Sequence, residues 1–311
     1  MTARILSTRS PAGQLLTVER LDSCTSTTAY LEKIARHEGR SGYVVVCDNV
    51  TGQDAALPPE KPGESTLFVS ILLRPSLAPG RSVYLTALSA LALAKAAERH
   101  SPYKPQIAWV SDVYTENKKK LGEVTLRSAL HPSGLGYLYI TVNFALRITE
   151  AFAGKLPDVV ESVFSQHKTT LTERIADTLI TEFFTLYEAN QPQDNTDDEQ
   201  KENAFLDEYR ERAVLRNRRI RVLQNGRRLS AGVIGIDDNA CLVVATRRGK
   251  SITLHSRLEI VDKRRDHLLA KLAAIRAKKA AAKEKAERKE QRAQARLAKK
   301  QAAAEEKQKS E

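Results

Sequence analysis

The most constraining feature of this 311-residue chain is the stretch at 83–100, VYLTALSALALAKAAERH. As a helix it is apolar on almost every side, rather than along one stripe. Such a helix must be covered on several sides by other elements, so we expect it to be buried. The chain can provide that cover, because 41% of its residues are hydrophobic and its length suits one substantial domain plus a smaller one.

Short apolar segments on both sides of this helix predict strands. The first strand contains Leu16, Val18 and Leu21, and the next two are GYVVVCDNV and TLFVSILLRPS. After the helix, QIAWVSDVYTENKKKLGEVTLRSAL predicts a hairpin and LGYLYITVNFAL a further strand. A helix follows the first strand, with Ser26, Thr27 or Thr28 as its cap, and LTERIADTLITEFFTLYEA predicts an amphipathic helix. This order favours an α+β domain built on a mixed sheet, over residues 1–188.

The rest of the chain divides by composition into three further parts. Residues 189–204 are polar and acidic and predict a linker. Residues 205–262 predict a short helix and then alternating strands with closely spaced turns, typical of a small β-barrel. Residues 263–311 are almost all Ala, Lys, Arg, Glu and Gln, which predicts a long, exposed helix that frays toward its end.

Charge is distributed unevenly along the chain. The net charge is +12, and residues 263–311 alone hold 17 Lys/Arg against 7 Asp/Glu. We therefore assign the basic character to the tail and not to the folded part. Such a tail predicts non-specific binding to nucleic acid, since it lacks aromatic residues for base stacking; a solvated helix with no partner is the alternative.

Several classes of protein are not expected. No apolar run is long enough for a membrane-spanning helix, and the first residues lack the apolar region of a signal peptide. Cys24, Cys47 and Cys241 are far apart in sequence, which favours reduced thiols and a cytoplasmic protein. The six histidines are scattered, so no structural zinc is predicted.

Several segments between residues 15 and 262 resemble, in order and spacing, those of the biotin–protein ligase family. LDSCTSTTAYL resembles L-D-x-x-D-S-T-N-x-Y-L, and YITVN resembles G-I-N-V-N. AWVSDVY and KKLGEVT resemble K-W-P-N-D-[VIL]-Y and K-L-x-G-I-L. The segments EYRERAVLRNRRIRVL and GVIGIDDNACLVV resemble the family's SH3-like barrel. The resemblance implies a biotin/lipoate ligase-like catalytic domain followed by an SH3-like domain.

The resemblance also implies a reaction and a set of site residues. Biotin and ATP would form biotinyl-AMP, and a lysine of a biotin carboxyl carrier domain would then take the acyl group. Lys120 matches the catalytic lysine, and Asp112 matches a carboxylate near the nucleotide that acts through Mg²⁺. The matching ligand-binding positions are Ser26 and Thr27 for the ureido group, Thr51 from the phosphate loop, Trp109 beside adenine, and Asn143 at the nucleotide. Most of these residues also have a purely structural interpretation. Lys120 and Asp112 are then turn residues, Trp109 is a core aromatic, Ser26 and Thr27 form a helix cap, and Asn143 is a buried amide.

The chain departs from the family's pattern where phosphate would bind. The family's Q-T-x-G-R-G-R-x-G-R is replaced by VTGQDAALPPEKP, which adds Asp54 and Glu60 and loses the arginines. Pro58 and Pro59 remove two backbone donors. Glu123 replaces a glycine, where its carboxylate would block a pocket or repel a ligand carboxylate.

Two main hypotheses remain open from sequence. One is a working biotin–protein ligase in which Arg247, Arg248 or the tail supplies the lost cations. The other is a pseudoenzyme that keeps the fold and binds a ligand or a carrier domain. A ligase for lipoate or octanoate is a third, less favoured hypothesis. Repressor activity is not expected, because no helix-turn-helix segment precedes the ligase-like part.

Overall fold

The computed structural model describes residues 3–37, 39–52, 57–58, 60–75, 81–133, 136–153, 170–191, 204–224, 227–256 and 260. The predictions for the tail at 263–311, for Asp54 and Pro59, and for nearly all of the linker at 189–204 fall outside these residues.

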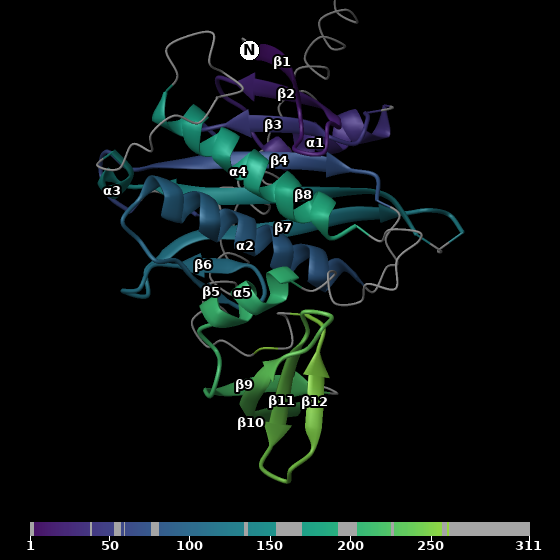
Figure 1. Ribbon diagram of the computed structural model, residues 1–311, viewed down its shortest axis with the longest axis vertical. Helices are drawn as coiled ribbons and strands as arrows, with labels where there is room; N and C mark the ends of the chain where they lie inside the picture. Colours follow the sequence, from purple (N-terminus) through teal and green to yellow (C-terminus); the bar gives the residue numbers. More distant parts are fainter. Residues whose placement is uncertain are drawn as a thin grey trace, which may run out of the picture.

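An eight-stranded sheet forms the centre of the larger part of the molecule (Figure 1). Its strands are β1 (Ala3–Arg9), β2 (Leu15–Leu21), β3 (Tyr43–Cys47), β4 (Ser65–Leu73), β5 (Gln106–Ala108), β6 (Asp112–Tyr114), β7 (Lys120–Leu130) and β8 (Tyr137–Ile148). Their order is β1-β2-β3-β4-β8-β7-β6-β5. Neighbouring strands are antiparallel except β2 and β3, which are parallel and joined through helix α1 (Thr27–Arg36). The predicted α+β fold with a mixed sheet is confirmed.

Helices cover both faces of this sheet. Helices α2 (Ser82–His100) and α4 (Leu171–Ala189) lie side by side across one face, with α5 (Ala204–Arg212) against α2 (Figure 1). Helix α1 packs on the other face, where Leu31 and Val45 belong to one buried cluster. Leu88 and Leu91 of α2 are at most 2% exposed. The all-apolar helix is therefore buried, as its sequence predicts. The short helix α3 (Glu150–Ala153) follows β8.

Polar caps fix where two helices begin. Ser26 is the N-cap of α1, and its Oγ accepts a hydrogen bond from the backbone N–H of Ala29 at 3.0 Å. Thr170 and Glu173 form a reciprocal capping box at the start of α4. Such caps typically contribute about 1 kcal/mol each, and the first one sets the position of the α1 N-terminus beside the candidate site.

A second, four-stranded antiparallel sheet follows α5. It consists of β9 (Arg219–Gln224), β10 (Arg227–Ile236), β11 (Leu242–Thr246) and β12 (Ser251–Leu254), in the order β12-β11-β10-β9. It projects from the rest of the molecule (Figure 1). Ile260 makes an isolated antiparallel bridge with Val222 of β9. The antiparallel pairing agrees with the predicted alternating strands, and the SH3-like assignment stays a prediction.

Two details differ from the sequence prediction. Strand β1 was not expected, because its residues alternate between exposed and half-buried and it is held only by pairing with β2. The predicted hairpin at 106–130 contains three strands, because residues 109–111 form a turn between β5 and β6. Among the described helices, none is long and apolar enough to cross a membrane.

Candidate ligand-binding site

Lys120 and Asp112 meet with Glu123 at the start of β7. The pairing of β6 with β7 sets Asp112 opposite Glu123, and a bulge nearby brings Lys120 alongside both. Lys120 Nζ lies 3.3 Å from Asp112 Oδ1 and forms a closer ion pair with Glu123. Asp112 is 1% exposed and Glu123 14%. With all three side chains ionised, this cluster carries a net charge of −1.

A second buried cation, Arg147, lies beside this cluster. It donates hydrogen bonds to the backbone carbonyl of Lys120 at 3.1 Å and to that of Pro58 at 3.0 Å. It also forms an ion pair with Glu60 at 2.7 Å, and its side chain is 7% exposed. Arg147 therefore links Pro58 and Glu60 to the start of β7, and the Glu60 carboxylate neutralises the Arg147 charge.

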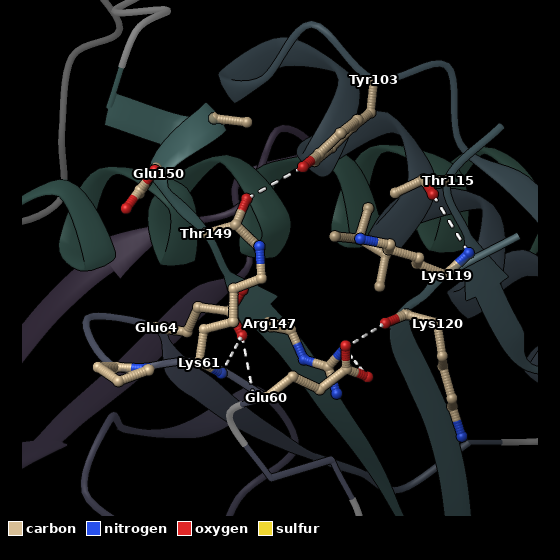
Figure 2. A pocket seen from close by; sticks show the side chains of 13 residues that line it. Glu60, Lys61, Glu64, Tyr103, Thr115, Lys119, Lys120, Arg147, Thr149 and Glu150 are labelled. Carbon is tan, nitrogen blue, oxygen red and sulfur yellow. Dashed lines mark hydrogen bonds and ion pairs between the residues drawn. The ribbon is translucent and has the colours of Figure 1, made fainter. Parts of the chain in front are cut away.

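The larger of two cavities at this place has a volume of about 260 Å³ (Figure 2). It is lined by charged and hydroxyl side chains, including Lys61, Tyr103, Lys119, Lys120 and Arg147. In Figure 2 the Lys120 side chain runs away from the middle of this cavity. The ammonium group is thus directed to its two carboxylate partners.

A smaller cavity of about 170 Å³ lies on the Glu123 side of the cluster. Its polar lining comprises Thr27, Thr28, Glu123, Thr125, Arg127 and Asn143, and its apolar lining comprises Val50, Phe68, Phe144 and Ala145. Lys120 lines the larger cavity and its partner Glu123 lines the smaller one. The Lys120–Glu123 pair therefore stands between the two cavities.

Asn143 gives the smaller cavity an unused hydrogen-bond acceptor. Its Nδ2 donates to the backbone carbonyls of Thr125 and Thr141, both at 3.2 Å. Its Oδ1 is buried and accepts no hydrogen bond from a described residue. Because a buried polar atom without a partner is costly, this oxygen favours a ligand that offers an N–H group.

The other predicted residues lie around the smaller cavity or away from it. Thr27 lines it, and its Oγ1 accepts a hydrogen bond from Ser70 at 2.9 Å. Ser26 acts as the helix cap and is not among the lining residues. Thr51 packs against Cys24, with its backbone N–H donating to the Cys24 carbonyl at 2.9 Å.

The Trp109 side chain is directed toward the small sheet. It is 1% exposed, and its Nε1 donates to the carbonyl of Ala240 at 2.7 Å. It lines neither cavity described above but a third one, of about 180 Å³, together with Leu215 and Val233. In this structure its indole joins the large sheet to the small one.

Two of the three cysteines, Cys24 and Cys47, are closer in space than their spacing in the sequence suggests. All three are free and buried. A hydrogen bond from the Cys24 thiol is the main cause that lowers the pKa of Cys47, to about 7. The backbone of Cys24 is hydrogen-bonded to Asn49 and Thr51, on either side of Val50, which lines the smaller cavity.

Arg147 is the site residue that sequence analysis missed. A signal was present, because it is the one charged residue in the otherwise uncharged strand YLYITVNFALRI. A charge in such a strand requires a partner. Among the described residues, no group of three or more His, Cys, Asp or Glu side chains could hold a metal ion.

Comparison with known proteins supports the fold through structures and not through sequence. No protein-family model matches the chain, and no curated protein sequence matches it. A mutant of the biotin protein ligase from Aquifex aeolicus in complex with biotin superposes with a TM-score of 0.55 at 15% identity, over 78% of this chain and 97% of that one. This chain has the fold of a biotin protein ligase.

Two further structures with the ligase fold are similar. The Aquifex aeolicus ligase in complex with biotin and ATP gives a TM-score of 0.53 at 16% identity, over 78% of this chain and 97% of that one. A biotin protein ligase-like protein of unknown function from Silicibacter gives 0.55 at 12% identity, over 82% of this chain and all of that one. At these identities the likeness establishes the ligase fold and leaves the activity to the site residues.

Proposed function

We propose that this chain is a pseudoenzyme that uses the biotin protein ligase fold to bind a ligand and no longer activates a carboxylic acid with ATP. The observation that carries the proposal is the pairing of Lys120 with Glu123 in addition to Asp112. An adenylating site needs an unneutralised cation where the carboxylate and the α-phosphate meet. Here that cation has two carboxylate partners.

The repulsion between Glu123 and a ligand carboxylate is large enough to weaken binding of a free acid. Two like charges about 5 Å apart repel by about 3 kcal/mol at an effective dielectric constant of about 20. That corresponds to a loss of about two orders of magnitude in affinity. A ligand carboxylate that approaches Glu123 would meet this repulsion. Of the two nearby arginines, Arg147 lines the larger cavity and is paired with Glu60, and Arg127 lines the smaller cavity and is paired with Glu32 at 3.9 Å.

The smaller cavity favours an uncharged ligand with N–H donors. Asn143 Oδ1 and the Glu123 carboxylate are both acceptors, and the remaining walls include Val50, Phe68 and Phe144. A ureido ring such as that of biotin meets the first requirement. An amide-linked side chain suits Glu123 better than a free acid, because an amide N–H can donate to it. A carrier domain that presents such a group is the expected partner, in the cytoplasm.

The alternative is a working ligase, and one observation favours it. The predicted pair Lys120 and Asp112 is in contact at 3.3 Å, between two cavities that could hold two substrates. Biotin and ATP would then bind on either side of Lys120, with Thr27 at the biotin. Asn143, which the resemblance assigns to the nucleotide, lines the same cavity as Thr27 and would also contact biotin.

Biotin-dependent exchange of pyrophosphate with ATP distinguishes the two functions. The exchange occurs only if a carboxylate attacks the α-phosphate and releases pyrophosphate reversibly. We expect the wild-type protein to show no more exchange than the Lys120→Ala variant at high biotin concentration. Exchange that is present in the wild type and absent in Lys120→Ala would establish the ligase and reject the pseudoenzyme.

A separate proposal concerns the basic tail. We propose that residues 263–311 bind nucleic acid without sequence preference, on the strength of their composition alone. Truncation before residue 263 is expected to weaken binding and to flatten its dependence on salt. Unchanged binding after truncation would reject a role for the tail in binding nucleic acid.

A further inference from the structure

The small sheet exposes one face to solvent. Its strands alternate, so that Val222, Ala231, Val244 and Leu254 are buried on one side. On the other side, Arg219 and Arg221 of β9 are exposed, together with Ser230, Ser251 and Thr253 of the neighbouring strands. Because the sheet projects from the rest of the molecule, this face is accessible (Figure 1).

Basic side chains border this exposed face at two places. Arg218 precedes Arg219 and Arg221 at the β9 edge, and Arg247, Arg248 and Lys250 occupy the turn between β11 and β12. We call these six residues and the strand surface between them the arginine face. None of the six forms an ion pair with a carboxylate of the described residues.

Acidic residues do not compensate this charge. Residues 213–256 contain nine Lys/Arg and only Asp237 and Asp238 as acids. Asp238 is paired with Arg210 at 2.7 Å, and Asp237 accepts backbone N–H groups of its own turn. The local field of the small sheet is therefore positive, although the chain before residue 263 has little net charge.

The strand surface between these cations carries small residues. Arg219, Gly232, Ala245 and Ser251 lie in register across the four strands. A Cβ atom added at Gly232 would have no neighbour within 4 Å. Four strands span about 14 Å, from the usual spacing of neighbouring strands. An extended chain of phosphates can lie on this surface and contact cations at both borders.

We propose that the arginine face binds the phosphodiester backbone of a nucleic acid. Five of its six cations are arginines, which bind phosphate oxygens in a bidentate manner. The two exposed apolar side chains of the sheet, Leu223 and Ile234, are too few to insert into a membrane. Aromatic side chains are absent from the described part of this sheet, so recognition is independent of base sequence.

The last described residue, Ile260, lies beside this surface. Ile260 pairs with Val222 of β9, the strand that carries Arg219 and Arg221. The basic residues at 263–311 then follow in sequence. The proposal depends neither on the ligand cavity nor on the tail, since its residues belong to β9 and to the β11–β12 turn.

A pair of matched double variants of the full chain tests the proposal. Arg219→Gln/Arg221→Gln removes two charges from the arginine face, and Arg36→Gln/Arg40→Gln removes two exposed charges from the large domain. The probe is a fluorescein-labelled single-stranded RNA of about 20 nucleotides and mixed sequence, with binding read by anisotropy over a series of salt concentrations. Arg247→Gln/Lys250→Gln serves as a second variant, since it changes only an exposed turn.

We expect the β9 variant to bind at least about 10-fold more weakly and to lower the salt slope by about 1.4, while the control changes affinity less than about 2-fold. The turn variant is expected to weaken binding in the same direction. Equal losses in the β9 variant and the control would overturn the proposal, because net charge alone would then explain binding. So would wild-type protein that binds phosphatidylserine vesicles and ignores RNA.

Discussion

Gly52 brings the backbone so close to Thr25 that a side chain has no room between them. A Cβ atom at this position would lie 1.9 Å from the Thr25 carbonyl oxygen, which is backbone and cannot turn aside. The segment it holds includes Val50, a wall of the smaller cavity. We expect Gly52→Ala to lower the free energy of unfolding by about 2 kcal/mol or more, measured by urea titration.

Gly136→Ala is the matched control at this scale. A Cβ atom there would meet nothing within 4 Å, so we expect a change below about 0.5 kcal/mol. Equal effects of the two substitutions would show that the close approach at Gly52 does not constrain the fold.

Glu19 joins three elements of the fold through one buried carboxylate. It accepts hydrogen bonds from Tyr30 of α1 at 2.8 Å and from Tyr43 of β3 at 2.7 Å. Burial raises the pKa of Tyr30 to about 12, with the hydrogen bond to Glu19 as the next cause. The pKa of Tyr43 is raised by the same causes.

This arrangement predicts how the attachment of α1 responds to alkali. Because the folded-state pKa of Tyr30 is raised, its contribution to stability is complete below pH 10, its ordinary value, and is lost as the pH rises through about 12. We expect the free energy of unfolding to fall over this range, and to fall less in Tyr30→Phe. A Tyr30→Phe variant with the same alkaline loss as the wild type would contradict this account.

Contacts around Trp109 connect the large sheet to the small one. Its indole N–H donates to Ala240 of the small sheet, and Tyr209 of α5 donates to the carbonyl of Val110 at 3.0 Å. We expect Trp109→Phe to lower the free energy of unfolding by about 1 kcal/mol, for the lost hydrogen bond. Trp109→Ala should cost about 3–5 kcal/mol, because it also leaves a cavity. Calorimetric unfolding measures both, and an unchanged Trp109→Ala would refute this role.

Sequence predicts the fold well where the signal is local. The all-apolar stretch of α2, the cap at Ser26 and the apolar runs of β3 and β4 each appear where their residue types require. Strand β1 has no such signal, since its position depends on pairing with β2.

The site was predictable only in part. The sequence marked Glu60 and Glu123 as unusual, but their partners, Arg147 and Lys120, depend on strand register and loop closure.

The central claim is that the negative charge of Glu123 lowers the affinity of the smaller cavity for free carboxylic acids. Calorimetric affinities for biotin and for biotin amide, in the wild type and in Glu123→Gln, test it most directly. We expect the wild type to bind the amide at least about 10-fold more tightly than the acid, and the nearly isosteric glutamine to remove that preference by strengthening binding of the acid. Equal wild-type affinities for acid and amide, or an unchanged preference in Glu123→Gln, would contradict the claim.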